Sequence, residues 1–288
     1  MSLAQRAAAF RIAAVGGWLR DTRPGRTVAR VVQGLVEIQI VDRALALAAQ
    51  MFTSVLPVII AASVFSGWHT GAETISDQFG FNTGTLAAPD ADTSDPSLAA
   101  FGVVGLLMVV LSGTSFARAL GRVYGAVWQV PSMGPRDAWR WLAALLAVAL
   151  SVGLVGQTRD LSHVHYVGFP LAVIGELVVW TLVWTFAAFL LTKGALTGRL
   201  LWVTGALTAV GLTAVHAAGR VALPRITANA QQHFGSLGLA FTSVSWLFVM
   251  SIVIVGAAAV VRAFADDETF IGRYLRGPDG VVDISDRL

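Results

Sequence analysis

Six long stretches of apolar residues run through this chain, and shorter polar segments separate them. Each stretch is close to the roughly 20 residues that an α-helix needs to cross the apolar core of a bilayer, which is about 30 Å thick. We therefore predict an all-α fold, a polytopic membrane bundle of six transmembrane helices. The predicted spans are residues 44–66, 98–116, 139–155, 167–192, 200–221 and 237–261.

The segment before the first span has a different pattern, in which arginines interrupt the apolar positions. Apolar side chains recur at helical spacing within residues 27–41, and residues 3–19 combine aromatic, aliphatic and basic side chains. A basic amphipathic segment is suited to lying on the inner membrane surface. We therefore predict a cytoplasmic interfacial arm over residues 1–43, with a frayed arm as the alternative. The transmembrane domain then covers residues 44–261, and a polar cytoplasmic tail covers residues 262–288.

Charge strengthens the membrane assignment and orients it. Charged residues make up 13% of the 288 positions and hydrophobic residues 56%, whereas a soluble domain has about 25% charged residues. Of the 20 Lys and Arg residues, 17 fall in the arm, the second and fourth loops and the tail, and 3 lie elsewhere. Because cytoplasmic loops accumulate Lys and Arg, we predict a multi-pass protein of the inner (plasma) membrane with both termini in the cytoplasm.

The segments next to the basic residues indicate what these residues bind. The pI of 9.9 would suggest nucleic acid in a soluble protein. Here the basic residues flank membrane spans, so membrane lipids are the expected partner and nucleic acid is not. Arg118 and Arg122 are four residues apart at the inner end of the second span and are candidates to hold an anionic headgroup; the alternative is that they are topology anchors.

Ionisable residues inside a membrane span are costly and are functional candidates by default. Glu176 lies within the fourth span, and His216 and Arg220 share a face of the fifth. The predicted orientation places all three in the outer half of the membrane. We hypothesise that Glu176 pairs with Arg220 or His216 across the bundle and faces a polar cavity. The alternatives are a structural link between helices, and an Arg220 side chain that reaches the outer surface.

The first span supplies two further candidates for an intramembrane polar site, Gln50 and Pro57. Proline lacks an N–H group, so Pro57 cannot bond the carbonyl of Thr53. The nearby hydroxyl groups of Thr53 and Ser54 can satisfy such freed backbone groups in a membrane helix. A kink with an exposed carbonyl would line a pathway; a kink that only packs is the alternative.

Motifs of soluble enzymes are absent from the sequence. It contains no Cys, no phosphate-binding loop that ends in Gly-Lys-Ser/Thr and no His-Glu-x-x-His motif. His163 and His165 have the spacing of metal ligands, but no further ligand accompanies them. We therefore expect no catalytic residue, no metal and no cofactor.

Several short motifs resemble those of the YihY/BrkB family of inner-membrane proteins, in its actinobacterial branch. They are residues 47–57 (LAAQMFTSVLP), 114–120 (TSFARAL) with Tyr124, 235–238 (GSLG), 245–247 (SWL) and 256–257 (GA). The resemblance covers about residues 30–265 and implies the six-span topology. Members commonly carry an acidic residue directly after the final Gly-Ala, where this chain has Ala258. The family has also carried ribonuclease and virulence-factor labels.

Three functions follow from these features, in order of preference. The first is the movement or export of a small or amphipathic molecule, a lipid included, which Glu176, Gln50, Pro57 and the basic inner rim favour. The second is a non-transporting scaffold in envelope assembly, which the small residues four apart in the fifth span favour. The third is a membrane-bound ribonuclease, which we discount because the predicted cytoplasmic loops lack clustered carboxylates. The sequence leaves a homo-oligomer open.

Overall fold

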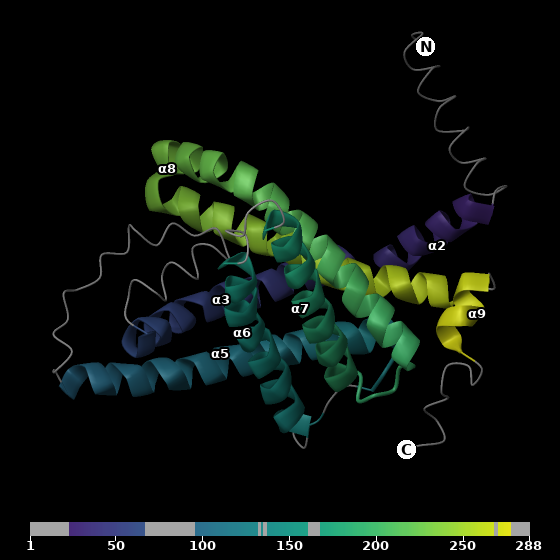
Figure 1. The fold of residues 1–288 in the computed structure, drawn as a ribbon, viewed down its shortest axis with the longest axis horizontal. Coiled ribbons are helices and arrows are strands. Elements are labelled where there is room, and N and C mark those ends of the chain that lie inside the picture. Colours follow the sequence, from purple (N-terminus) through teal and green to yellow (C-terminus); the bar gives the residue numbers. More distant parts are fainter. Residues whose placement is uncertain are drawn as a thin grey trace, which may run out of the picture.

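A computed structural model describes residues 23–66, 96–131, 134, 137–160, 168–267 and 270–277 (Figure 1). Within these ranges every regular element is a helix, which confirms the all-α prediction. The elements are α2 (Arg23–Glu37), α3 (Ile40–Ser66), α5 (Pro96–Trp128), α6 (Ala138–Asp160), α7 (Gly168–Leu191), α8 (Gly198–Ala265) and α9 (Phe270–Arg276).

Three helical segments of the described chain are long and apolar enough to cross a membrane, namely Pro170–Leu191, Gly198–Gly235 and Leu237–Ala265. Large apolar side chains stand exposed on the outer faces of the bundle, among them Leu111, Leu146, Leu182 and Val210. So many exposed apolar side chains would favour aggregation in water, whereas lipid tails solvate them. The architecture is therefore that of a membrane protein.

The longest helix, α8, is two helices joined at a sharp reversal. Gly235 has φ 58° and ψ −137°, a conformation open to glycine, and the chain turns back on itself there (Figure 1). We call Gly198–Gly235 the first arm of α8 and Leu237–Ala265 the second arm. A side chain at Gly238 would collide with the backbone of Ala230, so the two arms approach closely just after the turn.

The helices extend beyond several predicted spans. The first arm of α8 continues past the predicted end at residue 221 as far as Gly235, with Pro224 inside it. At 1.5 Å per residue its 38 residues measure about 57 Å, nearly twice the apolar thickness of a bilayer. Helix α5 likewise continues from the predicted end at residue 116 to Trp128. The physical reason is packing, because Leu120, Tyr124 and Val127 are fully buried in the core.

The core is centred on α7 and on both arms of α8, with α3 and α5 on the other side of the second arm. Small residues allow the close approach of α7 and α8. A side chain at Gly205 would collide with Thr185, and Ala209, one turn later, is fully buried. These belong to the small residues that the sequence places four apart, and they serve contacts within the bundle.

The described part of the predicted arm is a regular helix, α2, which contacts mainly α8. The turn into α3 passes through Gln39, which has a positive φ of 52°. Val28, Val32 and Val36 form an apolar strip that is 43–70% exposed, while Leu35 and Ile38 pack against the core. Residues 1–22 lie outside the described residues, and with them the prediction for 3–19.

Candidate functional site

Glu176 on α7 is buried between α7 and the first arm of α8. Its Oε1 atom lies 3.3 Å from Nδ1 of His216, and its Oε2 atom lies 3.7 Å from Nη2 of Arg220. Glu176 and His216 are 3% and 7% exposed. The hypothesis of a pair across the bundle is thus met by both proposed partners, and all three residues lie at one height.

The side chains of Glu176, His216 and Arg220 differ in their exposure to solvent. The Arg220 side chain is 52% exposed, so its charge lies at the edge of the bundle and only the carboxylate is deep. The His216 ring stacks on the Trp180 ring, with centroids 6.0 Å apart. A buried carboxylate is expensive unless polar or charged groups compensate it. Here a ring nitrogen approaches one carboxylate oxygen and a guanidinium the other, and Trp180 fixes the ring.

Gln50 belongs to a separate contact. The Ser115 hydroxyl on α5 donates a hydrogen bond of 2.9 Å to Oε1 of Gln50 on α3. Within the described residues α3 makes no contact with α7. Gln50 therefore links two neighbouring helices and does not join Glu176, contrary to the grouping in one polar site. The described backbone of α3 continues as helix through residue 57, while the side chain of Pro57 lies outside the described residues.

Arg118 and Arg122 are both exposed on α5. The guanidinium of Arg118 lies 5.8 Å from the ring centroid of Trp141, and its Nε donates to the Thr114 carbonyl at 3.4 Å. They do not line the pocket described next. The structure thus places the predicted headgroup residues on an open helix face.

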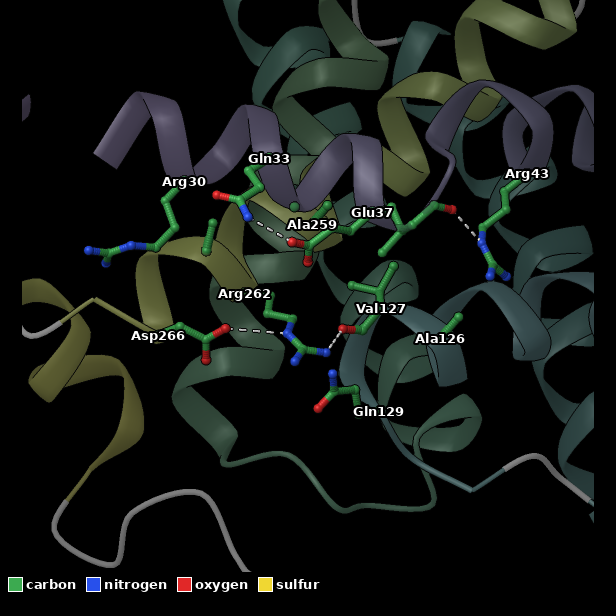
Figure 2. Close-up of a pocket in the computed structure, with 13 residues that line it drawn as sticks. Arg30, Gln33, Glu37, Arg43, Ala126, Val127, Gln129, Ala259, Arg262 and Asp266 are labelled. Atoms are coloured by element: carbon green, nitrogen blue, oxygen red, sulfur yellow. Dashed lines mark hydrogen bonds and ion pairs between the residues drawn. The ribbon is translucent and has the colours of Figure 1, made fainter. Parts of the chain in front are cut away.

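The structure adds a pocket that sequence reasoning missed, between α2, the end of α5 and the end of α8 (Figure 2). Its volume is about 380 Å³. Its charged and amide residues are Arg30, Gln33, Glu37, Arg43, Gln129, Arg262 and Asp266. In Figure 2 Gln33 and Glu37 of α2 point toward Arg262 across the space, while Arg30 extends along its edge. The pocket therefore holds positively charged donors and negatively charged acceptors within one small volume.

Ion pairs and hydrogen bonds hold the walls of this pocket. The side chain of Asp267, just after α8, lies 3.0 Å from Arg30 and accepts a hydrogen bond of 2.8 Å from Thr27. Arg262 donates to the carbonyl of Val127, and its Nε lies 3.4 Å from Asp266. Helix α2 is therefore fixed to residues some 240 positions away. The alternation of apolar and polar positions in residues 27–41 was the one available signal of a polar face.

A second group of charges connects two loops of the described chain. Asp137, just before α6, lies 3.0 Å from Nζ of Lys193 and 3.7 Å from Nε of Arg140. The hydrogen bond from Lys193 lowers the pKa of Asp137 below its usual value, and the Gly134 amide and both positive charges act in the same direction. This cluster links the α5–α6 connection to the α7–α8 connection.

Ala258 occupies the position that is acidic in the YihY/BrkB pattern, so this position has no polar side chain here. Ala258 is fully buried in the second arm of α8. No family model, no curated protein and no solved structure gives a significant match to this chain. The function must therefore be argued from the residues and their geometry.

Proposed function

We propose that this chain is a six-span inner-membrane protein of the YihY/BrkB type that moves or exports a small or amphipathic molecule, with a lipid as the first substrate to test. The observation that carries the proposal is the Glu176–His216–Arg220 group. It combines a buried carboxylate with an imidazole ring and a half-exposed guanidinium between two helices of membrane length. Charged residues inside membrane bundles commonly mark substrate, ion or proton pathways.

The contact geometry supports a moving charge at this site. Arg220 approaches Glu176 only to 3.7 Å and is half exposed, so a small side-chain movement separates the two. A passing headgroup that took the place of Arg220 would therefore change the charge balance between α7 and α8.

The topology rests on the charge pattern and on the motif resemblance. The uneven division of 17 and 3 basic residues supports both termini in the cytoplasm. Because the chain has no Cys, single introduced cysteines report sidedness without background. We expect Ser76→Cys to react with a membrane-impermeant maleimide in intact cells, and Ser285→Cys to react only after lysis. The reverse pattern would contradict the orientation.

Transport is tested in proteoliposomes that contain a dye-labelled phospholipid. Chemical quenching of the outer-leaflet dye then measures how fast lipid crosses the bilayer. We expect the wild-type protein to accelerate crossing and Glu176→Gln to return it close to the rate of protein-free vesicles. Asp42→Asn is the matched control, because it makes the same carboxylate-to-amide change at an exposed position of α3.

The thermal unfolding of each variant in detergent separates loss of transport from loss of fold. Equal crossing rates in wild-type and protein-free vesicles, with folded protein, would contradict lipid movement. Equal rates in wild type and Glu176→Gln would remove the buried group from the mechanism.

An envelope-assembly scaffold is the second candidate function. Close packing favours it, since Gly205 meets Thr185, and Gly219 meets Trp246 without space for a side chain. If the protein is a scaffold, the wild type and Glu176→Gln should give equal lipid-crossing rates in every transport assay. Its function would be lost only when its partner proteins no longer bind. Cross-linking in cells, compared between the wild type and Glu176→Gln, distinguishes the two functions and also reports a homo-oligomer.

A further inference from the structure

The pocket behind α2 contains positive and negative side chains from three helices. Arg30 and Glu37 come from α2, Arg43 from the start of α3, and Arg262 with Asp266 from the end of α8. Its volume of about 380 Å³ is within the usual range of small-molecule sites, about 300–1,000 Å³. A purely anionic ligand would meet two carboxylates there, and a purely cationic one would meet three guanidinium groups. A ligand with both charges satisfies the pocket best.

Two of the arginines are held in place by backbone carbonyls. Nε of Arg43 donates to Ile38 at 2.6 Å, and Nη1 of Arg262 donates to Val127. A guanidinium carries five N–H donors in a fixed plane. For Arg262, which lies centrally in the pocket in Figure 2, fixing one side of this plane leaves the Nη2 group to meet a phosphate oxygen, whereas Arg43 lies at the edge of the pocket, beyond Val127. Arginine is well suited to phosphate because its donors match two oxygens at once.

The opposite side of α2 indicates how deep the pocket lies relative to the membrane. Val28, Val32 and Val36 are exposed on α2, and exposed Val41 and Leu45 continue the apolar surface onto α3. An amphipathic helix with this pattern lies at the boundary between headgroups and acyl chains. The polar side of the same helix forms a wall of the pocket, with Glu37 pointing into it (Figure 2). The pocket is therefore at headgroup depth.

We infer that this pocket binds the phosphoethanolamine unit of an amine-bearing phospholipid. The phosphate meets Arg262, and the primary ammonium group meets Glu37 and Asp266. This site rests on the membrane location proposed above and not on transport. The protein can hold such a lipid at α2 whether or not it moves lipids across the bilayer.

Native mass spectrometry of the purified full chain in detergent tests the inference. The probe is an equimolar mixture of phosphatidylethanolamine, phosphatidylcholine and phosphatidylglycerol with identical acyl chains. We expect phosphatidylethanolamine to be retained several-fold over the other two. The trimethylated amine of phosphatidylcholine has no N–H donor for the carboxylates, and phosphatidylglycerol brings no positive charge to them.

Variants separate the two halves of the headgroup. Arg262→Gln should weaken retention of all three lipids about tenfold, which corresponds to about one charge-assisted hydrogen bond. Glu37→Gln together with Asp266→Asn should leave phosphatidylcholine unchanged and bring phosphatidylethanolamine down to its level. Arg273→Gln is the matched control, because it removes an exposed charge on α9, outside the pocket. Circular dichroism of each variant checks that it is folded.

Soluble phosphoethanolamine and inorganic phosphate identify the source of the ligand. We expect phosphoethanolamine to displace the bound lipid only at a large molar excess and inorganic phosphate to be weaker still. Displacement by phosphoethanolamine at equimolar concentration would support the same chemistry with a free metabolite as the source. Equal retention of phosphatidylethanolamine and phosphatidylcholine, or a loss of binding in Arg273→Gln as large as in Arg262→Gln, would overturn the inference. Failure of transport in proteoliposomes has no bearing on these outcomes.

Discussion

The two polar regions of this protein use charge in opposite ways. At the Glu176 site one carboxylate is deep in the bundle, and its two partners come from a single helix face. At the α2 pocket five charged side chains surround a space, and most of their partners are backbone carbonyls or neighbours on the same helix. The first region has charges in mutual contact; the second has charges arranged around a vacant volume.

This difference separates a site where the protein satisfies its own charges from a site that is suited to a ligand. Removing one partner of a buried pair leaves an uncompensated charge and costs about 3–5 kcal/mol. Removing a partly exposed charge costs about 0–1 kcal/mol, because water replaces the lost partner. The Glu176 site should therefore respond through stability, and the α2 pocket through ligand binding. The four predictions below test this contrast, from the largest expected effect to the smallest.

The largest loss of stability should follow His216→Leu. This change leaves one oxygen of Glu176 without its neighbour at 3.3 Å. We expect the free energy of unfolding to fall by about 3 kcal/mol. The double variant Glu176→Leu with His216→Leu should recover most of this loss, since it removes the buried charge as well. Denaturant unfolding in detergent micelles, followed by circular dichroism, measures both.

Arg220→Gln provides the internal comparison for this prediction. Its side chain is 52% exposed, so water can replace much of its interaction with Glu176. We expect a loss of about 1 kcal/mol, clearly smaller than that of His216→Leu. Equal losses in the two variants would show that the depth of the partner does not matter and would undermine the contrast between the regions.

At the α2 pocket, Asp267→Asn should loosen one helix and leave the bundle intact. It removes the ion pair with Arg30 and weakens the bond from Thr27, at a cost of about 1 kcal/mol. Hydrogen–deuterium exchange should become faster in α2 while α7 and α8 keep their protection. A uniform rise in exchange across all helices would instead show that Asp267 stabilises the whole bundle and not α2 alone.

The contrast also explains what the sequence could predict. The apolar stretches predicted the all-α class and included the three described segments that are long and apolar enough to cross a membrane, because the length and composition of such a stretch are local properties. The charge pattern predicted a direction for each helix, and from these directions we expected Glu176, His216 and Arg220 at one height. Their contact in the structure agrees with that reasoning.

The α2 pocket was beyond such reasoning for a physical reason. It depends on Asp267 meeting Thr27 across 240 positions and on Arg262 meeting the end of α5. No local pattern encodes which polar side chains of distant segments share a space. The grouping of Gln50 with Glu176 failed in the same way, because membrane depth alone does not say which helices are neighbours.

An uncharged link inside the bundle should have a smaller effect than the charged contacts of either region. Ser115→Ala removes the hydrogen bond of 2.9 Å to Gln50 and leaves no charge behind. Interhelical hydrogen bonds in membrane proteins contribute about 0.6 kcal/mol on average, so we expect a loss of about that size in micelle unfolding. A loss as large as that of His216→Leu would mean that Gln50 carries more than a packing contact.

The smallest effect should come from Asp137, whose partners are Lys193, in the α7–α8 connection, and Arg140, in the first turn of α6. The hydrogen bond from Lys193 is the main cause that lowers the pKa of Asp137 from 3.8 in the folded state. A lowered pKa means that the unfolded chain binds the proton more readily, so acid favours unfolding. The stabilisation is therefore complete above pH of about 3.8 and is lost as the pH falls further, through the folded pKa.

Melting temperatures in detergent between pH 2.5 and pH 6 measure this dependence. We expect the wild type to lose slightly more stability than Asp137→Asn below pH of about 4, and the two curves to run parallel above it. The matched control is Asp266→Asn, whose carboxylate is 53% exposed and pairs with Arg262 on its own helix. A wild-type curve parallel to that of Asp137→Asn over the whole range would show that the ion pairs of Asp137 contribute nothing to the stability of the folded state.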